Sequence, residues 1–65
     1  MLSKNLKKYR TQKGLTQEAL SRKADVSYNT IIKIESGVVT NPRMDNLMKL
    51  SNALDVSMDK LSGRK

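Results

Sequence analysis

The chain has 65 residues, with 13 Lys and Arg against six Asp and Glu, so its formal net charge is +7 and its length suits one small domain spanning residues 1–65. It has no Cys and no His, which excludes disulfides and the usual zinc and haem ligands, and it shows no Gly-rich phosphate loop, nucleophile elbow or convincing pair of acids. We therefore expect neither an enzyme nor a cofactor, and the positive charge favours a polyanionic partner (DNA, RNA or an anionic membrane surface) unless it only keeps a small protein soluble.

Residues 3–13 are predicted to form the first helix. Apolar side chains recur there at steps of three to four residues, and lysines occupy the opposite side. Gly14 ends this helix, and Leu15 turns inward as the apolar residue that often follows a glycine C-cap. A lysine stripe of this kind is more often a solvated face than a binding site, and the apolar side is too narrow to anchor the helix firmly on a membrane.

A second helix over residues 17–24 is predicted to begin after Thr16, which is a natural N-cap. Two alanines in its slim inner stripe allow another helix to approach closely. The next three residues, 25–27, form a turn so short that the second and third helices must meet steeply, as in a helix-turn-helix. Asp25 is expected to adopt the left-handed conformation, which Asp tolerates better than most residues.

The third helix is predicted over residues 28–36, between an N-cap at Ser27 and a positive-φ glycine at Gly37. Its inner face is apolar, with Ile31 and Ile34. Its outer face, about 140 to 200° from Ile31 on a helical wheel, offers amide, amine and hydroxyl groups and no acid. Such a face suits DNA base edges and phosphates, although any surface helix of a small domain has one apolar and one polar side. The outer residues are Asn29, Lys33 and Ser36.

Two further helices complete an all-α, compact five-helix bundle. The fourth is predicted over residues 43–54, with Asn41 and Pro42 as an alternative cap and first position. The fifth follows a turn at Asp55 and is predicted over residues 58–62. The inner face of the fourth helix is expected to contain Met44, Leu47, Leu50, Ser51 and Leu54, and the core of the domain to contain Leu6, Leu15, Leu20, Ile31, Ile34, Leu47, Leu50, Leu54 and Val56.

Several linked motifs in the chain are specific enough to indicate a protein family. They are Gly14-Leu15-Thr16-Gln17-Glu18-Ala19-Leu20, Val26-Ser27, the group Ile31, Ile34, Glu35, Ser36 and Gly37, then Asn41-Pro42 and Ala53-Leu54-Asp55-Val56-Ser57. Together, over residues 2–61, they resemble the lambdoid phage repressor and Cro helix-turn-helix family of DNA-binding transcriptional regulators. The resemblance implies a five-helix bundle whose third helix enters the major groove, the docking described for phage repressors. It implies sequence-specific binding of double-stranded DNA by a transcriptional regulator, which we expect to be a repressor.

The resemblance also implies roles for individual residues. Gln17 would contact the DNA backbone and brace the third helix. Asn29 suits adenine and Lys33 suits guanine, whereas Tyr28 could read a base, stack on one or touch a phosphate. Phosphates or the groove edge would be reached by Ser27, Ser36, Thr40 and Arg43.

An internal ion pair between the first and third helices is a further implication of the resemblance. Arg10 and Glu35 stand at the matching positions, and the pair would orient the recognition helix, although Arg10 could also touch a phosphate. Ile32 could meet a thymine methyl group or cover the ion pair. The chain departs from the family pattern at Asp25 and Asp55, where Gly is usual, and at Arg43, where a Ser or Thr cap is frequent. 

One copy would make few base contacts, so we expect a homodimer on a palindromic operator. The dimer contact would involve Met58 and Leu61, with the Val38-Val39 loop as a second candidate. Because this contact is small, we expect two copies to associate only when DNA brings them together. Two alternatives stay open: a protein-interaction module of the antitoxin or coactivator-bridging type, using Val38, Val39 and Ile32, and RNA binding, which the scarcity of aromatics disfavours. We expect no membrane partner, no small-molecule ligand in this domain and a cytoplasmic location, because neither a membrane span nor a signal peptide is visible.

Overall fold

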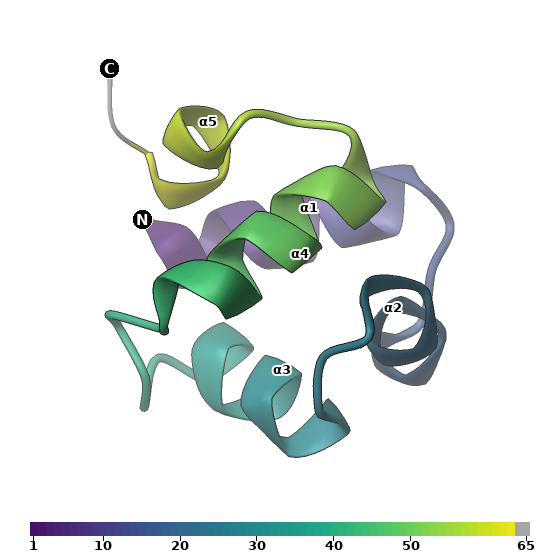
Figure 1. The fold of residues 1–65 in the computed structure, drawn as a ribbon, viewed down its shortest axis with the longest axis horizontal. Coiled ribbons are helices and arrows are strands. Elements are labelled where there is room, and N and C mark those ends of the chain that lie inside the picture. The colour runs from purple at the N-terminus through teal and green to yellow at the C-terminus, as the bar shows by residue number, and fades with distance from the viewer. Residues whose placement is uncertain (64–65) are drawn as a thin grey trace.

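Five α-helices follow one another in the computed structural model of the chain, which describes residues 1–63 (Figure 1). These residues contain no β-strand, so the all-α, five-helix prediction is confirmed. Arg64 and Lys65, the last residues of the predicted domain 1–65, lie outside the described residues. The helices are α1 (Leu2–Gln12), α2 (Gln17–Ala24), α3 (Tyr28–Glu35), α4 (Met44–Leu54) and α5 (Met58–Ser62).

The helix bounds differ from the predicted ones by one residue at most, at both ends of α1, at the end of α3 and at the start of α4. The prediction placed this start at residue 43, with Asn41 and Pro42 as an alternative. Arg43 is instead the N-cap residue, with an extended backbone (φ −60°, ψ 147°), so a helix cannot run through it from Pro42. In α1 and α3 the expected last residues, Lys13 and Ser36, are the C-cap residues.

The helices pack into a small bundle in which Met1 and Gly63, the first and last described residues, lie close together. Helix α1 packs against α3 and α5, while α2 packs against α3 and α4. In Figure 1, α2 is seen almost end-on and α3 runs across the picture below α4, so α2 and α3 cross steeply, as the short turn between them predicts. This crossing leaves the lower side of α3 uncovered by other helices.

Aliphatic side chains fill the space between the helices. The fully buried ones are Leu6, Leu20, Ile31, Ile34, Leu50, Leu54 and Leu61. Most of the predicted core is among them, whereas Leu15, Leu47 and Val56 are only partly buried against it. One prediction is wrong: Met44 is 63% exposed, because it is the first residue of α4 and lies at the rim of the bundle rather than over its centre.

Three helices end with the same closing hydrogen bond. The N–H of Leu15, Val26 or Val56 donates to the carbonyl five residues earlier, at 3.1, 3.1 and 3.0 Å, after a residue in the left-handed conformation. That residue is Gly14 at the end of α1 but Asp25 and Asp55 (both φ 57°) after α2 and α4. The motif satisfies carbonyls at the helix end and turns the next apolar residue back toward the core.

Because an L residue at positive φ is strained, Asp25→Gly and Asp55→Gly are each expected to stabilise the domain by a few tenths to about 1 kcal/mol. Asp25 would lose only an exposed contact with Lys49 (3.9 Å), and such pairs contribute little. The measurement is thermal unfolding, in which 1 kcal/mol raises the Tm by about 4 to 8 °C for a domain of this size. Gly14→Ala is the matched control, because a Cβ there meets nothing within 4 Å and no charge changes, so a loss reports an L residue at positive φ rather than a clash. Unchanged or lower Tm values in both Asp→Gly variants would contradict the prediction.

With 11 residues at most, the helices of residues 1–63 fall short of the about 20 apolar residues that a membrane span requires.

Candidate nucleic-acid interface

The turn between α2 and α3 presents one face of α3 to solvent. Asp25 reverses the chain in the left-handed conformation, and Val26 is buried directly after it, which anchors the turn in the core. Ile31 and Ile34 then fix the inner side of α3, since both are fully buried. The opposite side of the helix must therefore face outward, whatever side chains it contains.

The outward side of α3 is polar, as expected. Tyr28, Asn29, Lys33 and Ser36 are all exposed, and the structure brings them together along one surface. The Ser36 hydroxyl donates to the Lys33 carbonyl at 3.1 Å, so it is partly engaged within the chain. Asn29 and Lys33 are four residues apart and so stand one above the other on this face, about 6 Å apart along the helix axis.

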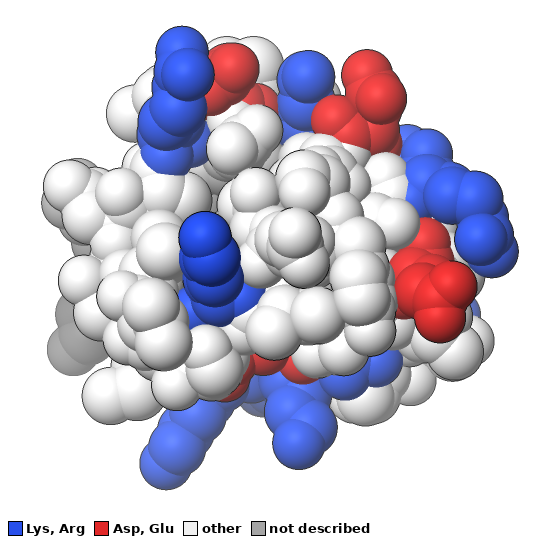
Figure 2. All heavy atoms as spheres, turned by 90° about the horizontal axis from the view of Figure 1, so that it is seen from below, with Lys and Arg blue, Asp and Glu red and all other residues white. Residues whose placement is uncertain are grey.

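Charge is distributed around this surface rather than across it. Figure 2 views the molecule from the α3 side: its middle is mostly uncharged, with a basic side chain standing out from it, and along the edges Lys and Arg stand beside several Asp and Glu. The net charge of +7 adds a general attraction for polyanions. A mostly neutral centre with hydrogen-bonding side chains, edged by Lys and Arg as well as by some acids, is compatible with a DNA duplex, whose base edges lie between two phosphate backbones.

A buried polar network holds the C-terminal end of α3. Arg10 Nε donates to Glu35 Oε2 at 2.7 Å, and Arg10 Nη2 donates to Oε1 at 3.1 Å, so the expected ion pair is present and bidentate. Gln17 Nε2 also donates to Glu35 Oε1, at 3.0 Å, and Arg10 Nη1 donates to the Leu15 carbonyl at 2.8 Å. The Arg10 and Glu35 side chains are only 11% and 5% exposed. This network ties the end of α3 to α1 and to the start of α2, and thereby sets the tilt of α3.

The Leu15 carbonyl is the member of this network that sequence reasoning missed. Every residue has a carbonyl, so no sequence signal marks this one. It becomes available because Gly14, in the left-handed conformation, points the chain back toward Arg10. The brace expected of Gln17 on the third helix is visible as its hydrogen bond to Glu35. Ile32 is half-buried on α3.

The remaining predicted contacts flank α3 in the sequence: Ser27 is its N-cap residue, and Thr40 and Arg43 lie in the loop between α3 and α4. Ser27, Thr40 and Arg43 are exposed, and the only ion pair of Arg43 within residues 1–63 is an exposed one with Asp45 at 3.6 Å. Ser27 occupies the N-cap position of α3 as expected, but among the described residues its hydroxyl makes no capping hydrogen bond. Because Ser27 is exposed, its hydroxyl is available to a ligand. Thr16, by contrast, caps α2 by accepting from the N–H of Ala19 at 3.0 Å.

Two predicted protein-contact surfaces need correction. Leu61 is fully buried in the core, so it cannot contribute to a dimer contact without unfolding α5; Met58 beside it is half-buried. In the Val38-Val39 loop only Val38 is exposed, at 75%, because Val39 packs against the core. An interaction module was expected to use the apolar side chains of Val38, Val39 and Ile32. Only Val38 is exposed, because Val39 and Ile32 are partly covered.

Comparison with known proteins identifies a family and several relatives that this chain resembles. A model of the helix-turn-helix family matches residues 6–61. The HTH-type transcriptional regulator SinR of Bacillus licheniformis is 37% identical over 65 residues, which is 100% of this chain and 59% of SinR. The chain thus spans about three fifths of the length of the SinR proteins that it matches.

Two solved structures superpose closely on this fold. The N-terminal DNA-binding domain of SinR from Bacillus subtilis has a TM-score of 0.91 at 38% identity, covering 94% of this chain and 88% of that chain. A structure of SinR, the master regulator for biofilm formation, in complex with DNA has a TM-score of 0.90 at 38% identity, covering 94% and 97% of the two chains.

Proposed function

The chain belongs to the helix-turn-helix family, and from this membership we propose that it binds double-stranded DNA sequence-specifically as a transcriptional regulator, a repressor, with α3 in the major groove. The observation that carries the proposal is the exposed polar face of α3, held in place by the buried Arg10–Glu35–Gln17 network. The similarity of this chain to a SinR structure solved in complex with DNA supports DNA binding. The proposed role is binding rather than catalysis.

Individual side chains take the following roles in this proposal. Asn29 reads adenine with its amide, and Lys33 donates to guanine O6 or N7. Tyr28 is exposed at the first turn of α3 and contacts a base or a phosphate there. The phosphate and groove-edge contacts are assigned to Gln17, Ser27, Ser36, Thr40 and Arg43.

We propose further that two copies bind a palindromic operator, with half-sites about one helical turn apart. The copies would meet through Met58 and Val38, which remain accessible, and not through Leu61. Each copy has a net charge of +7, so two copies repel each other until DNA phosphates neutralise that charge. The dimer is therefore expected on DNA rather than in free solution.

Residues 1–65 act in this proposal as one DNA-binding domain, without a cofactor or a small-molecule ligand. Its place of action is the cytoplasm, beside the DNA.

The test of the proposal is selection of bound sequences from a random duplex pool, followed by a salt titration on the enriched sequence. We expect an inverted repeat with half-sites near ten base pairs apart, and an affinity that falls with salt by a slope of about 0.9 per phosphate contacted. Recovery of no enriched sequence, with only weak binding that salt abolishes, would reject sequence-specific recognition.

Removing one base-reading side chain should relax the sequence preference. Asn29→Ala and Lys33→Ala are each expected to cost about 1 to 3 kcal/mol on the operator and to relax the preference at one or two base pairs. Both side chains are exposed, so the fold should be unaffected. Repeating the selection with each variant measures the change.

Arg43→Ala is the matched control, because Arg43 is exposed, lies directly before α4 rather than on α3, and is assigned a phosphate. It should weaken operator and random DNA alike and reduce the salt slope by about 1. If Asn29→Ala weakened operator and random DNA equally, the assignment of α3 as the reading helix would be wrong.

A further inference from the structure

The excess positive charge of the described chain is concentrated on its first helix. Residues 1–17 contain five Lys and Arg and no acid, whereas residues 18–63 contain six Lys and Arg and six Asp and Glu. Of the five, Arg10 already pairs with Glu35. The segment that contains the proposed base readers is thus balanced in charge, and within residues 1–63 the net charge comes from α1 and the turn after it.

Three lysines form one outer face of α1. Lys4, Lys7 and Lys8 are all exposed, and they lie within about 100° of one another on a helical wheel. Leu2 and Leu6 are buried on the opposite side of the helix, about 180° away. We call the three lysines the lysine face.

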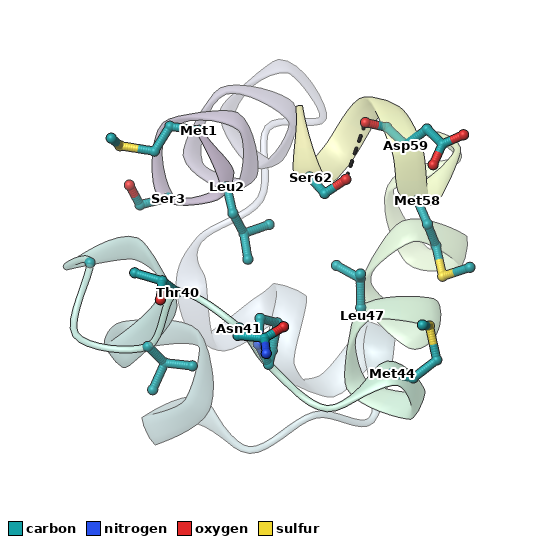
Figure 3. A pocket seen from close by; sticks show the side chains of 13 residues that line it. Met1, Leu2, Ser3, Thr40, Asn41, Met44, Leu47, Met58, Asp59 and Ser62 are labelled. Atoms are coloured by element: carbon teal, nitrogen blue, oxygen red, sulfur yellow. Dashed lines mark hydrogen bonds between the residues drawn. The ribbon is translucent and has the colours of Figure 1, made fainter. Parts of the chain in front are cut away.

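The inner side of α1 borders the rest of the bundle. An open groove with a volume of about 500 Å³ lies between α1, the α3–α4 loop, α4 and α5. Figure 3 shows Leu2 pointing from α1 into this groove, with Leu47 on its other side. The lining also includes Met1, Met44 and Met58 and contains none of the three lysines. The lysine face therefore points away from the bundle.

The lysine face and the reading face of α3 also point in different directions. In Figure 1, α1 lies behind α4, whereas α3 runs below α4. The outer side of α1 thus faces the back of the molecule, and the outer side of α3 faces down. A duplex that follows α3 leaves the back of the molecule open.

The ammonium groups of the lysine face have no carboxylate partner among residues 1–63. Lys8 Nζ lies over the ring of Tyr9, 5.6 Å from its centroid. The Thr11 hydroxyl, on the same side of the helix, is engaged with the carbonyls of Lys7 and Lys8, 2.9 Å from each. The face therefore offers cations rather than hydrogen-bonding groups.

This arrangement is unfavourable for α1 by itself. Lys4 is three residues from Lys7 and four from Lys8, so like charges are neighbours on the helix and repel each other. Lys4 also lies in the first turn, near the positive end of the helix dipole. The first turns of α2, α4 and α5 each contain an acid, whereas that of α1 has none. A polyanion bound to the lysine face would relieve both kinds of repulsion.

The composition of the lysine face indicates which polyanion it suits. A protein interface is anchored by apolar or aromatic side chains, and a membrane surface by apolar ones that insert into it. The apolar side chains of α1, Leu2 and Leu6, are buried, and Tyr9 is half-buried, so it offers no open platform for the stacked bases of a single strand. The phosphate backbone of a DNA duplex is bound through charge and needs no such anchor.

We propose that the lysine face binds the phosphate backbone of a second DNA duplex while α3 reads the operator, so that one complex joins two DNA segments. The inference rests on the proposed function of α3, and it uses none of the residues assigned to operator contacts. Lys4 and Lys8 are about 6 Å apart along the helix axis, and phosphates of one strand follow at about 3.4 Å along the duplex, so the two lysines span about two phosphate steps. This contact is independent of base sequence, because it reaches phosphates alone.

The experiment measures whether one complex holds two duplexes. The full chain is bound to the operator duplex recovered by selection, which bears a donor dye, and a duplex of random sequence with an acceptor dye is titrated in. We expect energy transfer that saturates. If three phosphates are contacted, the affinity for the second duplex should fall about forty-fold between about 50 and 200 mM salt. Fluorescence anisotropy of the donor duplex reports operator binding separately. Absence of operator binding would contradict the proposed function, whereas absence of energy transfer on an occupied operator would contradict this inference alone.

Two triple variants remove the same charge from different places. The first neutralises the lysine face and combines Lys4→Gln, Lys7→Gln and Lys8→Gln. The control neutralises three exposed lysines on other parts of the surface and combines Lys13→Gln, Lys23→Gln and Lys60→Gln. The first should weaken binding of the second duplex by at least about ten-fold, and the control by less than about threefold, with the operator sequence preference kept in both. The Tm of the first should not fall, because repulsion on α1 has been removed.

Several results would overturn the inference. They are energy transfer that is unchanged in the first variant, or that is weakened equally by both triple variants. Anionic lipid vesicles that compete better than duplex at equal phosphate concentration would identify a membrane as the partner instead. A loss of operator affinity in the first variant that grows as the operator duplex is lengthened would assign the lysine face to flanking DNA of the same duplex.

Discussion

Glu35→Ala is expected to cost about 3 to 5 kcal/mol of folding free energy, because it leaves the Arg10 guanidinium buried without its partner. The loss is large for this chain, since small domains of fewer than about 70 to 80 residues rarely gain more than about 3 to 5 kcal/mol from their core. Gln17 loses its acceptor in the same variant. Urea unfolding followed by circular dichroism measures the effect, and we expect a chain that is largely unfolded at room temperature.

A matched control separates the buried carboxylate from charge in general. Glu18→Ala removes an exposed acid from the first turn of α2 and should cost well under 1 kcal/mol, as is usual for favourable charges near a helix N-terminus (about 0.3 to 1 kcal/mol). A Glu35→Ala loss as small as that of Glu18→Ala would mean that solvent reaches the ion pair freely, contrary to its burial.

The double variant Arg10→Met with Glu35→Leu separates the effect of the ion pair on folding stability from its effect on operator binding. Replacing both partners of a buried pair by apolar side chains is often neutral or stabilising. We therefore expect the double variant to fold but to bind the operator more weakly, because α3 has lost the contacts that set its tilt. Operator binding equal to that of the parent chain would show that the network contributes stability alone.

Leu61→Ala is expected to cost about 2 to 5 kcal/mol, as buried leucines do when a cavity is left behind. Helix α5 has only five residues and so has little stability of its own. Leu61 is its one fully buried side chain, and the polar tie between Asn5 Nδ2 and the Lys60 carbonyl is long, at 3.4 Å. Loss of Leu61 should release α5 from α1 and α4, which urea unfolding and amide hydrogen exchange in α5 would both report.

Met58→Ala is the control on the same helix. Met58 is half-buried and lines the groove, so its truncation should cost less stability than that of Leu61. If Leu61→Ala left the unfolding free energy unchanged and altered only the association of two copies, Leu61 would be a surface contact after all, and the burial assigned to it would be wrong.

Local chemistry determined the helices. Thr16 offers a hydroxyl to the next turn, Gly14 and Gly37 tolerate positive φ, and the apolar residues after α1, α2 and α4 turn inward, all of which involve neighbours within a few residues. The steep crossing of α2 and α3 followed from the three-residue turn between them. Interactions at this range depend little on the rest of the chain, and they could be predicted. The α4 start was misplaced because Asn41, Pro42 and Arg43 are each compatible with a helix start, and local preference does not choose among them.

The exposed face of α3 was also predictable. Ile31 and Ile34 mark its buried side, and the helical period of about 3.6 residues then identifies the residues on the opposite side. The Arg10–Glu35 pair, by contrast, was implied only by the resemblance to a known family. Nothing in the spacing of two residues 25 positions apart indicates that they meet.

The sequence by itself determined the five helices to within one residue at each end, and the side of α3 that faces outward. The tertiary structure alone decided that Leu61 is buried, that Met44 is exposed, and that Met1, Met44 and Met58 surround one groove. The physical reason is that periodicity states which residues share a side of a helix, while burial depends on which other helix covers that side. For a five-residue helix such as α5, and for the first turn of α4, there is too little periodicity to decide, and only packing against α1 and the α3–α4 loop does so.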